Sequence, residues 1–189
     1  LISNQQDIEL WEAYKKGDSN AFSALFRNHY TPLFRFGNKF TQDHEILEDC
    51  IQELFLELWQ NKAQTSVQSV KAYLFKSLKY KLYRAIGKKS GAVTLDISDE
   101  MSFELSYEAW LISDEESRER ALQLTRAFAQ LSNRQKEIIY LKFYQELSYE
   151  EVSDVMNINY QVARNLVYQA IRALKKIIVV SILCMAVLT

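Results

Sequence analysis

Glycine and proline are scarce in this chain, which has four glycines and one proline among its 189 residues. Sandwich and barrel folds need many turns built from these residues, and a Rossmann fold or a phosphate-binding loop needs a glycine-rich segment. The composition therefore disfavours all of these classes. What remains is a protein of long helices, and the sequence predicts an all-α fold.

Cysteine and histidine are also too few for a metal centre or a disulfide framework. Cys50 and Cys184 could form one bridge at most, and Cys50 falls on the apolar side of a helical pattern. That placement is typical of a buried thiol in a reducing compartment. The two histidines, His29 and His44, have no zinc-ligand spacing with cysteine. We therefore expect no metal and no cofactor.

Two further absences concern catalysis and targeting. No nucleophile–base pair and no phosphate loop is visible, so we expect no enzymatic activity. The N-terminal segment is polar and acidic, which disfavours a signal peptide and favours a cytoplasmic protein.

The formal charge of −1 hides a strong segregation of charge along the chain. Residues 43–57 hold six acids and no base, residues 58–95 hold eight bases and no acid, and residues 96–120 hold nine acids and two arginines. After Asp154 the chain has four bases and no acid. Two separate basic segments in a near-neutral chain indicate two contacts with a polyanion. The acidic stretch between them is interpreted as a linker.

Apolar residues recur at helical spacing between Ile46 and Leu58, which predicts an amphipathic helix. Its opposite face carries Glu45, Glu48, Asp49, Gln52, Glu53 and Glu57. Judged by the residues alone, this acidic face is most simply a solvated surface. The polar stretch Asn61–Ser69 that follows predicts a loop.

A second helix is expected over Val70–Lys89, with a buried apolar stripe and a basic outer face. Lys76, Lys79, Tyr80 and Tyr83 are expected to share that outer face. Lysines pair with phosphates, and exposed tyrosines offer planar surfaces on which unpaired bases stack. The alternative is a basic helix that keeps the fold soluble, with its tyrosines half-buried. The run of positive charge without an acid favours contact with nucleic acid.

The most specific pattern lies between residues 148 and 174. Ser148-Tyr149-Glu150-Glu151 resembles a capping box, and Asn157-Ile158-Asn159 predicts a tight turn in which Asn159 caps the next helix. Two helices across such a turn predict a helix-turn-helix. The second helix exposes Arg, Asn and Gln, which pair with guanine and adenine in the major groove. An ordinary helical hairpin is the alternative.

These motifs resemble the extracytoplasmic-function (ECF) sigma factors of bacterial RNA polymerase, over roughly Trp11 to Lys176. The similar motifs are Lys16-Gly17-Asp18 with Ala21-Phe22, then Glu48-Asp49, Gln52-Glu53, Phe55 and Leu58-Trp59 for region 2, and Leu131-Ser132, Arg134-Gln135, Ser148–Val152 and Val162 for region 4. Residues 159–176 (NYQVARNLVYQAIRALKK) are especially similar to sigma factors of Bacteroidetes-type bacteria.

The resemblance implies two small helical domains that direct core polymerase to promoters. Region 2 would occupy residues 1–92, an acidic linker residues 93–116, and region 4 residues 117–178, followed by a tail of residues 179–189. The linker would run through the RNA-exit path, where its charge mimics nucleic acid. The implied partners are core RNA polymerase, promoter DNA and an anti-sigma factor or a separate recruiting protein, with no small-molecule substrate.

The resemblance also implies roles for individual residues. Polymerase docking would use Asp49, Gln52, Glu53, Leu56 and Trp59. Binding of the melted −10 strand would use Asn61, Lys62, Gln64, Ser66, Lys71, Lys76, Lys79, Tyr80, Tyr83, Arg84 and Lys88. Recognition of the −35 duplex would use Ser148, Tyr160, Gln161, Arg164, Asn165, Tyr168 and Arg172. Tyr80 and Arg84 depart from the family pattern, which usually has Asn and an acid there, so family-style melting contacts are not implied at these two positions.

The uncharged segment Ile177–Thr189 has no place in that pattern. It is shorter than the roughly 20 apolar residues that a membrane-spanning helix needs. We interpret it as a helix extension that packs on a domain or partner, with membrane contact as the alternative.

Two other function classes remain open. One is a helix-turn-helix regulator that binds duplex DNA alone as a symmetric dimer. The other is an interaction adaptor dominated by the apolar tail and the acidic linker. The basic, aromatic helix in the first half argues against the regulator, and the exposed face of the C-terminal helix argues against the adaptor.

Overall fold

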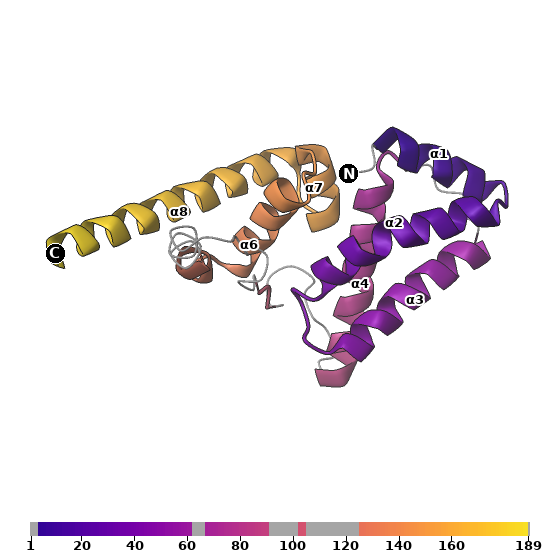
Figure 1. Cartoon of the computed structure of the whole chain (residues 1–189), viewed down its shortest axis with the longest axis horizontal. Coiled ribbons are helices and arrows are strands. Elements are labelled where there is room, and N and C mark those ends of the chain that lie inside the picture. Colours follow the sequence, from indigo (N-terminus) through magenta and orange to yellow (C-terminus); the bar gives the residue numbers. More distant parts are fainter. Residues whose placement is uncertain (1–3, 62–66, 91–101, 105–124, 189) are drawn as a thin grey trace. The chain divides into compact units, whose positions relative to one another are not determined.

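The computed structural model describes residues 4–61, 67–90, 102–104 and 125–188 (Figure 1). Within these ranges the secondary structure consists of helices and connecting turns, with no strand. The chain divides into two compact units, one built largely from residues 1–101 and the other largely from residues 102–189. The predicted all-α fold is confirmed.

The first unit is a bundle of four helices in which the second and the fourth each pack against all the others. Its helices are α1 (Asn4–Lys15), α2 (Ser19–Gly37), α3 (His44–Asn61) and α4 (Val70–Ser90). Helix α4 packs against each of the other three. A helix in that position has to bury several of its faces, which limits the surface it can offer to a ligand.

The corner between α1 and α2 shows what the Lys16-Gly17-Asp18 motif does. Gly17 has a φ of 98°, a left-handed conformation that ends α1 and that glycine adopts without steric cost. The Asp18 carboxylate then accepts hydrogen bonds from the backbone N–H groups of Asn20 at 2.8 Å and Ala21 at 3.2 Å. The motif is therefore a helix stop followed by a helix start.

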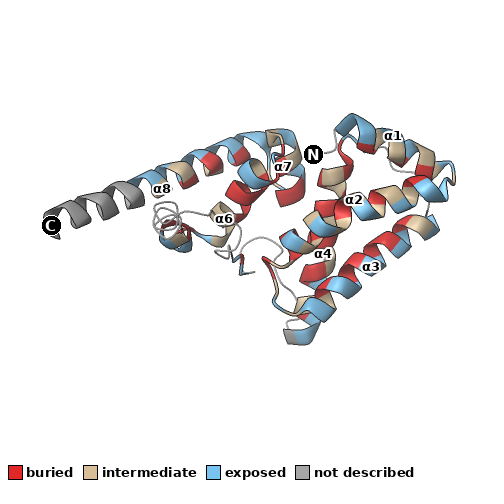
Figure 2. Ribbon diagram, viewed as in Figure 1, coloured by how far each residue is buried: buried red, intermediate tan, exposed pale blue. Residues whose placement is uncertain are grey.

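The core of the first unit follows the predicted apolar stripes. The fully or largely buried residues of α3 are Leu47, Cys50, Ile51, Leu54, Phe55 and Leu58. Figure 2 shows these positions as one buried side of the helix. Burial raises the pKa of the Cys50 thiol to about 11, as expected for an inert core cysteine. The Tyr14 hydroxyl donates to the Leu58 carbonyl and ties α1 to the end of α3.

The second unit contains α6 (Asn133–Ile139), the π-helical turn η2 (Tyr140–Tyr144), α7 (Tyr149–Met156) and α8 (Tyr160–Leu188). Helix α6 packs against α8. Helix α8 is continuous across the predicted domain boundary at residue 178, and the side chains beyond Lys176 lie outside the described residues. Searched over its described residues, the chain has no helix that is both long and apolar enough to cross a membrane.

The start of α6 explains the Leu131-Ser132…Arg134-Gln135 motif. The Ser132 hydroxyl accepts from the Gln135 backbone N–H at 3.3 Å, and the Gln135 side chain accepts from the Ser132 N–H at 3.1 Å. These two bonds form a capping box. Ser followed three residues later by Gln is the sequence signal for this capping box, which was missed from sequence.

We predict that Gly37→Ala destabilises the first unit by about 1 kcal/mol or more. A Cβ at this position would lie 2.2 Å from Leu47 Cδ1 and 3.3 Å from Leu82 Cδ1, and both leucines are fully buried. Overpacking of this kind costs about 1–3 kcal/mol, more than the roughly 1 kcal/mol that alanine gains over glycine in helix propensity. Urea unfolding followed by tryptophan fluorescence measures the change. The control is Ser23→Ala, on the exposed side of α2, and equal stability of both variants would contradict the prediction.

Candidate nucleic-acid and protein interfaces

The five residues predicted to dock on polymerase lie along one side of α3. Asp49, Gln52 and Glu53 are exposed, Leu56 is 59% exposed and Trp59 is half-buried. Positions separated by three or four residues share a helix face, so this set forms a continuous strip. A large apolar side chain as exposed as Leu56 is typical of an interaction surface when a groove lies beside it.

Such a groove runs between α2 and α3. Its volume is about 580 Å³, and its lining combines aromatic rings with a polar rim. The lining residues are Ser19, Phe22, Ser23, Phe26, Arg27, Gln52, Phe55, Leu56 and Trp59. The ring centroids of Phe22 and Trp59, and those of Phe26 and Phe55, are each 4.9 Å apart. The α2 side of this groove was missed from sequence, although Phe22 and Phe26 are one helical turn apart beside a buried stripe.

The acidic face of α3 is partly neutralised by α4. Lys81 Nζ lies 2.8 Å from a Glu57 carboxylate oxygen and 3.3 Å from a Glu53 oxygen. The two acids are largely exposed, so these ion pairs are weak contributors to stability. Their effect is to place one lysine of the basic helix at the edge of the acidic face.

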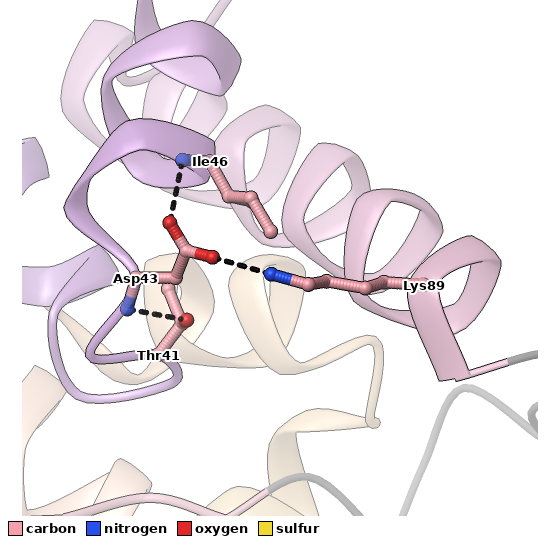
Figure 3. Close-up of polar contacts among 4 residues, drawn as sticks. All are labelled: Thr41, Asp43, Ile46 and Lys89. Carbon is pink, nitrogen blue, oxygen red and sulfur yellow. Dashed lines mark hydrogen bonds and ion pairs between the residues drawn. The ribbon is translucent and has the colours of Figure 1, made fainter.

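A second ion pair links the start of α3 to the end of α4 (Figure 3). One Asp43 oxygen accepts from the Ile46 backbone N–H at 3.2 Å, and the other lies 2.7 Å from Lys89 Nζ. The hydrogen bond from Lys89 lowers the pKa of Asp43, and its partner carboxylate raises the pKa of Lys89. Asp43 therefore caps α3 and holds the end of α4 with the same side chain.

The basic helix offers a smaller outer face than predicted. Arg84 and Lys88 are exposed, and Lys71, Lys76 and Tyr80 are half-buried. The expectation that Lys79 and Tyr83 share the outer face is wrong, because they are only 8% and 9% exposed.

The physical reason is that α4 packs against three other helices, which together cover much of its surface. The Lys79 ammonium lies 5.7 Å from the centre of the Tyr83 ring, and that ring lies 6.4 Å from the ring of Phe40. The lysine stem and the tyrosine thus belong to the packing of the bundle.

The loop predicted to read flipped bases is described only at its two ends. Asn61 is exposed at the end of α3, whereas Lys62, Gln64 and Ser66 lie outside the described residues. Within the described part of the chain, no cluster of three or more His, Cys, Asp or Glu residues could hold a metal ion.

The helix-turn-helix has the predicted geometry. The Glu151 carboxylate accepts from the Ser148 N–H at 2.6 Å, and the Ser148 hydroxyl accepts from the Glu151 N–H at 3.1 Å. Asn157 has a φ of 51°, and the Asn159 side chain accepts from the Val162 N–H at 2.8 Å. The predicted capping box, turn and second cap are therefore confirmed. Ser148 is half-buried, and its hydroxyl oxygen accepts a hydrogen bond in the cap.

The first turns of α8 present a continuous polar face to solvent. The exposed residues on it are Tyr160, Gln161, Arg164, Asn165, Tyr168, Gln169 and Arg172. Gln161 Nε2 donates to Asn165 Oδ1 at 3.2 Å, and the Arg164 guanidinium lies 5.9 Å from the centre of the Tyr160 ring. Ala163, Val167 and Ala170 are buried on the opposite side. The predicted amphipathic arrangement of this helix is confirmed.

Comparison with known proteins finds a family match in each half of the chain. Sigma-70 region 2 matches residues 25–91, and sigma-70 region 4 matches residues 121–174. The chain belongs to the sigma-70 family. It is 26% identical over 151 residues to the ECF RNA polymerase sigma factor SigM of Bacillus subtilis, an alignment that covers 80% of this chain and 91% of SigM.

Solved structures show the same fold. CnrH in complex with the cytosolic domain of CnrY matches with a TM-score of 0.59 at 16% identity, over 90% of this chain and 96% of that one. The sigma factor RpoE of Bartonella quintana, in complex with the anti-sigma factor NepR, matches with a TM-score of 0.56 at 21% identity, over 82% and 95%. Together with both region matches, the relatives identify an RNA polymerase sigma factor of the ECF class.

We predict that Asp43→Asn lowers stability at pH 7 and that the difference from wild type disappears in acid. The folded-state pKa of Asp43 is lowered, so its ion pair stabilises the fold above the ordinary value of 3.8 and is lost as the pH falls through the folded pKa. Asparagine keeps the helix cap and removes only the charge. Urea midpoints between pH 7 and pH 3 test this. Lys89→Met, which keeps the carboxylate, should show the same pH window, and a pH-independent difference would contradict the prediction.

Proposed function

We propose that this sigma factor docks on core RNA polymerase through the exposed strip of α3 and the groove beside it. The observation that carries the proposal is the position of all five predicted residues along one side of α3, with Gln52, Leu56 and Trp59 also lining the groove. Acids on the strip supply charge recognition, and the aromatic lining supplies apolar area. Interfaces of this composition bury an apolar centre inside a polar rim.

The −35 element would be read by the polar face of α8 in the major groove. Arg164 and Asn165 suit guanine and adenine, and the capped turn before α8 holds the start of the helix in a fixed direction. Tyr160, Gln161, Tyr168 and Arg172 surround these two on the same exposed face. Ser148 would contribute through the cap.

The melted −10 strand would be held by the exposed end of α4 and by the loop before it. Arg84 and Lys88 are exposed bases on α4, beside Lys89, which is paired with Asp43. Tyr80 is accessible enough to stack on a base. Lys71 and Lys76 would assist from half-buried positions, and Asn61, Lys62, Gln64 and Ser66 would read the flipped bases. Because Lys79 and Tyr83 are buried, we assign them to the support of this surface.

The protein would act in the cytoplasm and perform no chemistry, since the polymerase supplies catalysis. In both solved structures above the similar chain is bound to a partner protein, and for the sigma factor RpoE that partner is an anti-sigma factor. An inhibitor of that class is the proposed regulatory partner here.

Run-off transcription with purified core polymerase tests the whole proposal. A transcript that starts only when core enzyme and this protein are both present is the expected result. If the protein shifts duplex DNA alone but neither binds polymerase nor supports transcription, the proposal fails and the stand-alone regulator holds.

We predict that Arg164→Ala reduces the preference for the −35 sequence over a scrambled one by about tenfold. A bidentate arginine–guanine contact contributes about 1–3 kcal/mol of discrimination, and alanine removes it. Competitive transcription on the two promoters measures the ratio. Arg126→Ala, an exposed arginine of the same unit outside α8, is the control. A uniform loss on both promoters would identify Arg164 as a phosphate contact.

We predict that Asp49→Arg reduces co-purification with core polymerase at least tenfold. Reversing the charge at the N-terminal end of the strip places a cation against a surface selected for an acid, and such juxtapositions cost several kcal/mol. Pull-down of core enzyme measures the loss. Glu9→Arg makes the same reversal on the exposed side of α1 and should bind as wild type does. Unchanged recovery with Asp49→Arg would remove this face from the proposal.

A further inference from the structure

Phe103 lies in the acidic stretch between the two units, yet it is buried in the second unit. Its side chain is 1% exposed, whereas its neighbours Ser102 and Glu104 are exposed. Its ring meets the ring of Tyr140 edge-on, with centroids 5.8 Å apart and planes at 63°. Edge-to-face packing at this distance is the preferred geometry of an aromatic pair. A stretch predicted to be a plain linker therefore contains a packed side chain.

The site that receives Phe103 is built by the π-helical turn η2. The Gln145 N–H donates to the Tyr140 carbonyl at 3.0 Å, an i to i+5 bond that widens the helix. The Gln145 side chain also donates to the Tyr140 hydroxyl at 2.9 Å. The Tyr144 ring stacks on the Tyr140 ring at 4.9 Å. Tyr140 is thus fixed at both ends, and π-helical turns occur frequently where a helix serves a function.

We propose that Phe103 is an anchor that shortens the covalent tether between the two DNA-binding units and so restricts the spacing between promoter elements. This inference rests on the proposed function, in which the first unit holds the −10 strand and the second reads the −35 duplex. It makes Phe103 a positioning residue, because Phe103 would act on promoter choice through chain length without touching DNA.

The number of residues in the tether determines how strongly the anchor can restrict the separation of the two units. Phe103 lies 13 residues after Ser90, the last residue of α4, whereas Thr125, where helix is next described, lies 35 residues after it. At up to about 3.6 Å per residue, the first tether reaches at most about 47 Å and the second about 126 Å. The shorter tether allows fewer separations of the two units. Removing the anchor therefore raises the upper bound on the reach of the tether about 2.7-fold.

The test compares Phe103→Ala with two matched variants of the full-length protein. Phe103→Leu keeps an apolar anchor, and Phe143→Ala removes a phenylalanine that is 56% exposed on the same π-helical turn. The first measurement is the rate at which a glutamate-specific protease cleaves after Glu104. The second is transcription with core polymerase on promoters whose spacer varies by one base pair at a time.

We expect Phe103→Ala to accelerate cleavage after Glu104 several-fold, because a released segment fits a protease more readily. On the best spacer its transcription at limiting protein should fall several-fold, and the fraction retained on spacers two base pairs longer or shorter should rise. Phe103→Leu should lie close to wild type in both measurements, and Phe143→Ala should match wild type.

Each contrary result has a distinct meaning. Unchanged cleavage in Phe103→Ala would overturn the anchor itself. Faster cleavage with an unchanged spacer profile would overturn its role in promoter spacing. If no variant, wild type included, supports transcription with core polymerase, then the proposed function fails, while the cleavage measurement still decides whether Phe103 is anchored.

Discussion

The close approach of three helices at Gly37 is the constraint on which the first unit depends. At the end of α2 only a hydrogen atom fits between the backbone and the side chains of Leu47 and Leu82. This contact draws α3 and α4 against α2, and α1 then covers a further side of α4. A helix enclosed on so many sides keeps only a narrow exposed strip. The same contact that makes the bundle dense therefore determines which basic residues remain available to DNA.

The acidic and basic segments are separate in the sequence, but folding brings some of their charges into contact. Asp43 at the start of α3 meets Lys89 at the end of α4, and Glu57 near the end of α3 meets Lys81. These pairs run in opposite order along the two helices, as expected for antiparallel neighbours. Two of the bases in the basic segment are thereby engaged by α3, and the acid that remains most clearly available on the strip is Asp49. Acids and bases that form separate blocks in the sequence therefore lie side by side on neighbouring helices in the folded unit.

Sequence reasoning succeeded where the determining interactions are local. The helix-turn-helix was predictable because Ser148, Glu151 and Asn159 act on backbone groups within three residues of themselves. The exposed acidic side of α3 was predictable because the helical period separates it from the buried stripe. Both arguments need no knowledge of what packs against the helix.

Apart from the local capping box of Ser132 and Gln135, the features that sequence reasoning missed depend on contacts between distant segments. Lys79 and Tyr83 look like surface residues until α4 is enclosed by three helices, and the groove at Phe22 and Phe26 exists only once α3 lies beside α2. Phe103 is one aromatic residue in an acidic stretch, and nothing in the neighbouring sequence indicates that it packs against Tyr140, 37 positions later. The spacing of apolar residues in the sequence indicates which side of a helix is buried, but it does not indicate how many other helices pack against it.

A near-neutral protein that reads DNA has to divide its binding energy. Nonspecific affinity for duplex DNA grows with the number of phosphates neutralised, with a salt slope of about −0.9 for each. The exposed start of α8 offers only Arg164 and Arg172 for this purpose, followed by Lys175 and Lys176. So few charges give weak binding to duplex DNA at physiological salt. In the proposed function, base recognition by α8 becomes effective when docking on the polymerase supplies the remaining affinity, which is the division of labour expected of a specificity subunit.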